Sequence, residues 1–120
     1  MKISGGEIRQ DVGTGEGSRG GHIMGHTSSG KPIYSYAAHE NHSNFTPVDH
    51  AEAAHLHQHL AKAQEGKDTR EVIYHQANMA AHQKKALKLP ERAYPATIER
   101  NKARMPAVGE KFKEKYPVSS

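Results

Sequence analysis

The sequence predicts a mainly α-helical fold with an extended glycine-rich N-terminal arm, a short strand, an αα-hairpin and short basic C-terminal helices. Three observations lead to this prediction. Nine of the eleven glycines lie in residues 1–30, helix-capping signals follow at Thr46 and Asp68, and prolines interrupt the basic C-terminal third. We therefore divide the chain into the arm, a strand plus helical hairpin over 31–89, and a basic, proline-punctuated tail over 90–120.

The composition limits the size of the core and the classes of chemistry. A chain of 120 residues forms one small domain, and 34% hydrophobic with 6% aromatic residues is a small apolar share. We therefore expect a small core and an arm that contacts other subunits. The absence of cysteine excludes disulfides, cysteine–zinc sites and thiol catalysis. No apolar run has membrane-spanning length and residues 1–6 do not begin a signal peptide, so we expect no membrane partner and a cytoplasmic origin.

The glycine-rich arm has no periodic apolar pattern, and we expect at most a short strand at residues 7–12. Two stretches resemble phosphate-binding loops. Residues 15–20 fit G-x-G-x-x-G, but no strong strand precedes them and no helix follows. Residues 25–31 fit the first seven positions of a Walker A loop, but Pro32 replaces the Ser or Thr that ligates magnesium and blocks the following helix. We favour a polar turn that leads into a short strand, which the alternation of apolar and polar side chains predicts over 31–36.

The clearest helix start in the sequence follows the strand. Thr46 is a suitable N-cap, and Pro47 suits the first helical position. Asp49, at the third position, can accept a hydrogen bond from the backbone of the N-cap residue. Gly66 is a suitable helix end. We therefore predict a helix over 47–64.

A second helix should follow after a tight turn. Asp68 and Glu71 have the spacing of a reciprocal capping box, and Pro90 stops the helix. We predict a helix over 69–87, which pairs with the first as an αα-hairpin.

Four histidines can be registered about the turn at Gly66. His57 then lies opposite His75, and His50 opposite His82. Each helix carries its two histidines seven residues apart, so both lie on one face. Buried imidazoles that hydrogen-bond across the alanine-rich seam would fix the register of the hairpin, and we favour this interpretation.

A metal site is the alternative role for the histidines. A divalent metal such as zinc could bridge His57 and His75, but two imidazoles make an incomplete zinc site. The third ligand would come from His39 or His42 in the preceding loop. We otherwise expect no cofactor.

The other face of the first helix carries Glu52, His55 and His59 in an E-x-x-H-x-x-x-H pattern. This set could chelate a cation, although it is not the H-E-x-x-H motif of metalloproteases. Exposed, unpaired histidines are the favoured interpretation.

The C-terminal third is basic. Residues 84–120 contain ten Lys/Arg and four Asp/Glu, a net charge of +6, and we predict helices over 96–104 and 109–115. Phe112 and Tyr116 should anchor this end to a neighbouring subunit. The basic side chains either form a solvated helix face or bind polyanions. The residues predicted to contact polyanions are Lys84, Lys85, Lys88, Arg92, Arg100, Lys102 and Arg104.

A pattern over residues 26–60 resembles a segment of known proteins. It reads TSSGKPIY…H..H..FTP.DH..AA..H and comprises Thr27 to Tyr34, His39, His42, Phe45 to Pro47, Asp49, His50, Ala53, Ala54 and His57. This segment is similar to one that recurs in virion-associated proteins of tailed bacteriophages and prophages, both in small proteins and within larger polypeptides. The resemblance implies a phage setting but no particular reaction.

Three functions follow in order of preference. The first is a structural component of a bacteriophage particle (cement, neck, tail or internal virion protein) that is not an enzyme. Its partners would be other virion proteins in an oligomeric assembly, and its location the virion, with the host cytoplasm during assembly. The second is a nucleic-acid-binding accessory protein that uses the basic C-terminal third. The third is a histidine-based, metal-dependent hydrolase, for which Asp49 and Glu52 are the nearby carboxylates.

Overall fold

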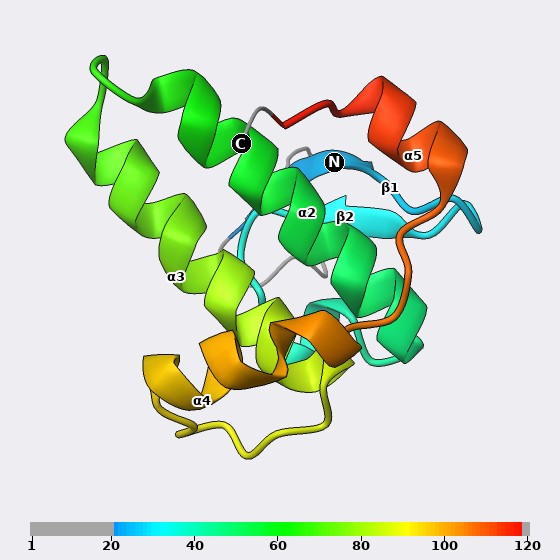
Figure 1. The fold of residues 1–120 in the computed structure, drawn as a ribbon. Coiled ribbons are helices and arrows are strands. Elements are labelled where there is room, and N and C mark those ends of the chain that lie inside the picture. Colours follow the sequence, from blue (N-terminus) through cyan, green and yellow to red (C-terminus); the bar gives the residue numbers. More distant parts are fainter. Residues whose placement is uncertain (1–20, 119–120) are drawn as a thin grey trace, which may run out of the picture.

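The computed structural model describes residues 21–118, and these form the predicted mainly helical fold (Figure 1). Two long helices, α2 (Pro47–Gln64) and α3 (Thr69–Ala86), lie side by side and make the largest contact in the fold. The remaining elements surround this hairpin. They are β1 (Ile23–His26), β2 (Pro32–Tyr34), the 3-10 helix η1 (His39–Asn41), α4 (Pro95–Asn101), the 3-10 helix η2 (Lys102–Arg104) and α5 (Glu110–Lys115).

Helix α2 has the predicted bounds because its start is capped locally. The Thr46 hydroxyl accepts a hydrogen bond from the Asp49 backbone N–H at 3.2 Å, and the Asp49 carboxylate accepts one from the Thr46 N–H at 3.0 Å. Pro47 occupies the first helical position. Beyond the helix end, Gly66 has φ +78°, a left-handed conformation that glycine adopts without strain. The predicted helix over 47–64 is confirmed.

Helix α3 is capped by Asp68, but the predicted reciprocal box with Glu71 is wrong. The Asp68 carboxylate accepts hydrogen bonds from the backbone N–H groups of Arg70 and Glu71. The Asp68 N–H itself donates to the Gln64 carbonyl at 3.1 Å. Because the turn already satisfies this donor, the Glu71 carboxylate is free to approach His75, at 3.3 Å.

The sheet corrects the boundary of the predicted arm. Strand β2 confirms the strand expected within 31–36, but β1 pairs with it antiparallel and lies inside the predicted arm over 1–30. Residues 21–30 therefore belong to the folded unit. A β-carbon at Gly25 would lie 2.7 Å from the Tyr116 hydroxyl and 3.2 Å from Leu56, so glycine permits this close packing. Residues 1–20, with the predicted strand at 7–12, lie outside the described residues.

The turn between the strands holds the first half of α2. Ser28 donates to both oxygens of the Glu52 carboxylate, from its backbone N–H at 2.8 Å and its hydroxyl at 2.7 Å. The Ser29 hydroxyl donates to Asp49 at 3.0 Å, and the Lys31 ammonium donates to the same carboxylate at 2.6 Å. Burial alone would raise the pKa of Asp49, but the hydrogen bonds from Lys31, Thr46 and Ser29 lower it. The stretch that resembles a Walker A loop thus binds two carboxylates of its own chain.

The core is small and lies between the sheet, α2 and α5. Its buried residues are Ile33, Ala53, Leu56 and Phe112, with Tyr116 packed against them. The prediction that Phe112 and Tyr116 anchor the chain to a neighbour is therefore wrong. Their spacing of four residues marks the inner face of α5, which returns to the sheet (Figure 1).

The face of α2 with Glu52, His55 and His59, for which exposed histidines or a cation site were predicted, instead binds other segments of the chain. The His55 ring donates to the Tyr116 carbonyl at 2.7 Å, and the His59 ring donates to the Pro117 carbonyl at 2.9 Å. Glu52 is buried beneath the Ser28 turn. These side chains therefore fasten the C-terminal segment and the turn to α2, because each finds a backbone partner distant in sequence.

The basic tail contains the two predicted helices with shifted bounds. The first begins one residue early, at Pro95, and becomes the 3-10 helix η2 after Asn101, so the predicted helix over 96–104 is in two parts. Ile98 on α4 is buried. Gly109 precedes the first residue of α5 as its N-cap.

Candidate functional site

The four histidines of the hairpin meet in two pairs, in the register that the sequence predicts. The Nδ1 atoms of His50 and His82 lie 3.0 Å apart, and so do those of His57 and His75. All four side chains are buried, and His57 and His82 have 0% exposure. The two pairs adjoin, because the rings of His57 and His82 are stacked with centroids 5.7 Å apart.

A fifth histidine, His42, closes one end of this seam. Its ring lies 4.7 Å from that of His82 and 4.6 Å from that of Phe45. Its Nε2 accepts the Tyr34 backbone N–H at 3.1 Å, and its Nδ1 lies 3.2 Å from the Ala38 carbonyl. Because a carbonyl only accepts, Nδ1 carries the proton. We call His42, His50, His57, His75 and His82 the histidine cluster.

The contacts of His75 set the protonation of its pair. A hydrogen bond between two Nδ1 atoms requires one donor and one acceptor. The Nε2 atom of His75 lies 3.3 Å from the Glu71 carboxylate, which accepts only, so it carries the hydrogen. His75 Nδ1 therefore accepts from His57 Nδ1–H. The Nε2 atom of His57 is left as a buried lone pair without a hydrogen-bond partner within residues 21–118.

The same logic assigns the second pair. The Nε2 atom of His82 is buried and has no partner in the described part of the chain. A buried N–H without an acceptor is rarer in proteins than an under-satisfied acceptor. His82 therefore carries its hydrogen on Nδ1 and donates it to His50. The hydrogen of His50 is then on Nε2, directed away from the seam.

The cluster is uncharged at neutral pH because burial disfavours the imidazolium form. Burial lowers the pKa of His42 and of His50 to about 4 and that of His57 to about 3, and it lowers the pKa of His82 well below its usual value. The positive charge of Lys85 acts in the same direction on His42, His50 and His82.

The structure does not assemble the predicted metal ligands. His57 and His75 bind each other directly, and both nitrogens of His42 are engaged by backbone atoms. His39 lies on η1 and is exposed. Within residues 21–118, no group of three or more potential ligand residues is placed to hold a metal ion.

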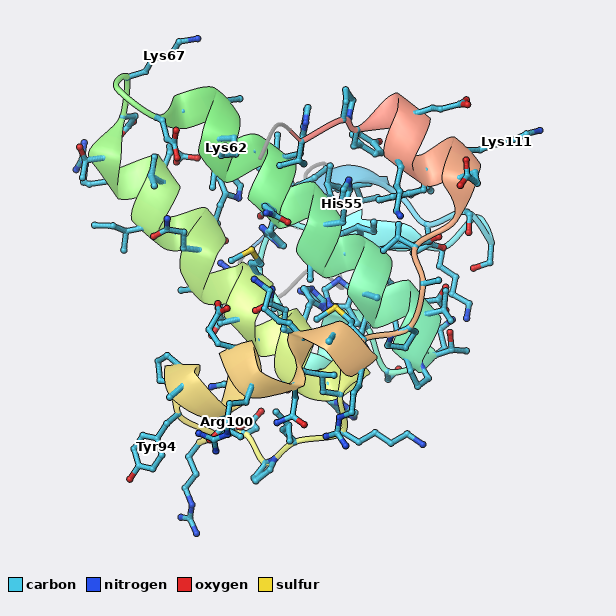
Figure 2. All side chains as sticks on the ribbon, viewed as in Figure 1. His55, Lys62, Lys67, Tyr94, Arg100 and Lys111 are labelled. Atoms are coloured by element: carbon cyan, nitrogen blue, oxygen red, sulfur yellow. The ribbon has the colours of Figure 1, made fainter. Side chains whose placement is uncertain are left out.

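The basic residues predicted to contact polyanions divide into two groups. Four lie against oxygen atoms of neighbouring residues: Lys84, Lys85, Lys102 and Arg104. The other three are exposed: Lys88, Arg92 and Arg100. Figure 2 shows Arg100 directed away from the ribbon. The seven residues are thus spread along the chain from α3 to η2 and form no single helix face.

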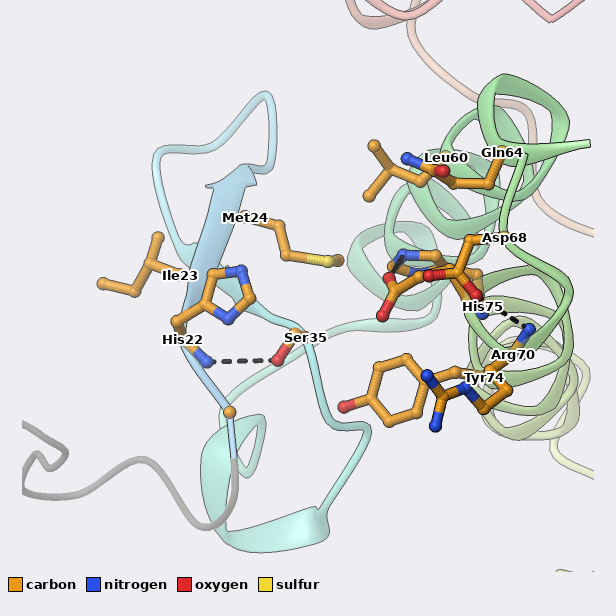
Figure 3. Close-up of a pocket in the computed structure, with 12 residues that line it drawn as sticks. His22, Ile23, Met24, Ser35, Leu60, Gln64, Asp68, Arg70, Tyr74 and His75 are labelled. Carbon is orange, nitrogen blue, oxygen red and sulfur yellow. Dashed lines mark hydrogen bonds and ion pairs between the residues drawn. The ribbon is translucent and has the colours of Figure 1, made fainter.

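Each end of the histidine cluster opens onto a cavity. Near His75, a cavity of about 810 Å³ separates β1 from the start of α3 and also contains Asp68, Glu71 and Tyr74. Figure 3 shows Tyr74 and His75 facing His22 and Ser35 across it. Near His50, a smaller cavity of about 320 Å³ lies between η1 and the two long helices. The first cavity contains carboxylates, whereas the second is lined by imidazoles and a lysine.

Comparisons with protein-family models, curated proteins and solved structures found no match for this chain. Within residues 21–118, none of the helices combines the length and apolar character required to cross a bilayer. The function is therefore argued from the site itself and from the resemblance of residues 26–60.

We predict that the histidine cluster makes the fold sensitive to acid. The folded-state pKa values of about 3 to 4 lie below the unfolded value of 6.5, so the unfolded chain takes up more protons as the pH falls. The free energy of unfolding should be greatest above pH 6.5 and decrease steadily toward about pH 4. The change His57→Leu should cost about 1–3 kcal/mol at neutral pH, because His75 Nδ1 loses its donor, and should reduce the dependence on pH.

Thermal melting of the wild type and His57→Leu from neutral to mildly acidic pH measures this effect. The exposed His26, changed to Leu, is the control and should retain the wild-type slope. Equal pH dependence in His57→Leu and the wild type would show that the cluster does not cause the acid sensitivity. A large loss of melting temperature on adding a chelator would instead support a metal between His57 and His75.

Proposed function

We propose that this protein is a structural component of a tailed-bacteriophage particle that acts through contacts with other subunits. The observation that carries the proposal is the distribution of apolar side chains. Within residues 21–118, the core cluster has four buried members, Ile33, Ala53, Leu56 and Phe112, with partly buried apolar side chains packed against them. Five large apolar side chains remain between 42% and 77% exposed: Ile23, Tyr36, Val48, Ile73 and Tyr94. Aromatic and large apolar groups are typical of contacts between subunits.

The residues of the phage-like pattern support this proposal because most of them build the fold. Ser28 and Lys31 hold the carboxylates of α2, and Thr46 caps it. His42 and His57 belong to the histidine cluster. A pattern made of folding residues is more typical of a recurring structural unit than of a catalytic set.

The hydrolase hypothesis comes last because the candidate carboxylates also have structural roles in the fold. A metal-dependent hydrolase would use Asp49 or Glu52 near the histidines. Asp49 instead binds Lys31 and Ser29, and Glu52 binds Ser28. Neither carboxylate projects toward the histidine cluster as a ligand or base.

We predict that Tyr94 contributes to incorporation into the particle. Its side chain is 77% exposed and projects from the N-terminus of α4 (Figure 2). Tyr94→Ser should preserve folding, because little buried surface is lost and Ser is a favourable N-cap. The measurement is the amount of the protein in purified particles of the phage or prophage that encodes it. Lys111→Ser, at an exposed position of α5, is the control and should be incorporated normally.

Absence of the wild-type protein from purified particles would refute the structural role. Equal incorporation of Tyr94→Ser and the wild type would leave particle membership intact but would exclude Tyr94 as a contact.

Nucleic-acid binding is the second candidate function. It is favoured by Lys88, Arg92 and Arg100, which are exposed and make no ion pair within residues 21–118. We predict weak binding to nucleic acid without sequence preference. Filter binding over a salt series should show a steep loss of affinity as salt rises, because binding releases counterions. A flat salt response, or no binding at low salt, would remove nucleic acid from the partners.

A further inference from the structure

The smaller cavity, at the His50 end of the histidine cluster, has a lysine and no carboxylate in its lining. Its volume is about 320 Å³, and it lies where η1, the start of α2 and the end of α3 meet. The residues that line it are His39, His42, Ser43, Phe45, Pro47, His50 and Lys85. No carboxylate is among them, and the Lys85 ammonium brings a positive charge to the cavity.

The carboxylates near this cavity are engaged or face solvent. Asp49 is buried and bound to the Lys31 ammonium at 2.6 Å. Glu40, on η1, is exposed. A Glu91 oxygen lies 3.8 Å from the Lys85 ammonium, but the Glu91 side chain is 90% exposed. The Lys85 side chain is 23% exposed, but its partner lies in solvent at this long distance. The pair therefore contributes little, and Lys85 can exchange it for a ligand.

The histidine cluster fixes what His50 offers to the cavity. Because His82 donates to His50 Nδ1, the hydrogen of His50 lies on Nε2. His50 lines the cavity, and its Nε2–H, which has no hydrogen-bond partner among residues 21–118, is available as a donor. His42 offers no donor, since its Nδ1–H is directed to the Ala38 carbonyl. The donors at the cavity are therefore Lys85 on α3, His50 on α2, and His39 and the Ser43 hydroxyl on the preceding segment.

We propose that this cavity binds a phosphate group, held by Lys85, His50 and His39. Donors that converge from three segments suit a tetrahedral anion, whose oxygens point in several directions, better than a planar carboxylate. The Lys85 ammonium supplies a charge-assisted hydrogen bond. The group comes from inorganic phosphate or from a small phosphate monoester.

Binding would join η1, α2 and α3 across the end of the hairpin. A ligand that binds only the folded state stabilises it by RT ln(1 + [L]/Kd), so the melting temperature rises with the concentration of phosphate. The imidazole signals of His39 and His50 should also shift as phosphate fills the cavity, whereas those of His26, on β1, should not.

The test is a titration with inorganic phosphate at constant ionic strength, followed by NMR of the imidazole signals and by thermal melting. Sodium chloride is the reference anion, and glycerol 3-phosphate is titrated in parallel. We expect saturable shifts of His39 and His50 and a rise in melting temperature. Tighter binding of glycerol 3-phosphate would identify a monoester as the ligand, and equal or weaker binding would identify inorganic phosphate.

Matched variants separate a built site from general attraction. Lys85→Gln should weaken phosphate binding by about tenfold or more, since a charge-assisted hydrogen bond is lost. Lys88→Gln removes the same charge from an exposed position outside the cavity and should bind normally. His39→Gln, also exposed, tests the site independently if Lys85→Gln alters folding.

Several results would overturn the proposal. One is the absence of saturable shifts at His39 and His50. Another is an equal loss of binding in Lys85→Gln and Lys88→Gln. A third is a response to a short oligonucleotide with none to either phosphate, which would assign the basic groups to backbone contacts with nucleic acid.

Discussion

Two hydrogen bonds between neutral imidazole rings, His50 to His82 and His57 to His75, hold α2 and α3 in register. Each bond needs one ring to donate and the other to accept, so a proton added to either acceptor removes the bond and places a charge in the interior. The rest of the hairpin keeps the paired rings close together and away from solvent. Buried alanines on α2 allow the helices to approach, and His42 covers the end of the seam against His82.

The parts of the fold that follow local rules could be predicted from the sequence. Thr46, Pro47 and Asp49 define the start of α2 within four residues, and the spacing of the histidines about Gly66 defines which ones meet. The parts that depend on distant partners could not. Strand β1 has no periodic pattern of its own and exists because β2 pairs with it. His42 was considered, with His39, as a third ligand of an alternative metal site, since nothing local indicates that its nitrogens bind the backbone of Tyr34 and Ala38.

The histidine cluster also connects two chemically different surfaces. His75 meets Glu71 at a cavity that contains carboxylates, whereas His50 faces a cavity with Lys85. In each pair, the contacts of one ring determine which ring donates the hydrogen bond, and these contacts lie at opposite ends of the cluster. Glu71 fixes His75, and the burial of His82 fixes His50. The proposed phosphate site uses the outer hydrogen of His50, so the pairs that stabilise the hairpin also determine what this end of the molecule can bind.

The central claim is that the cluster is neutral and that its donors point in assigned directions. Nitrogen-15 NMR of the imidazole rings at neutral pH tests it most directly, because the two nitrogens of a neutral ring differ in chemical shift and an imidazolium ring does not show this difference. We predict that His57 and His82 carry hydrogen on Nδ1 and that His50 and His75 carry it on Nε2. A doubly protonated ring among these four, or hydrogen on Nε2 of His57 and His82, would contradict the account.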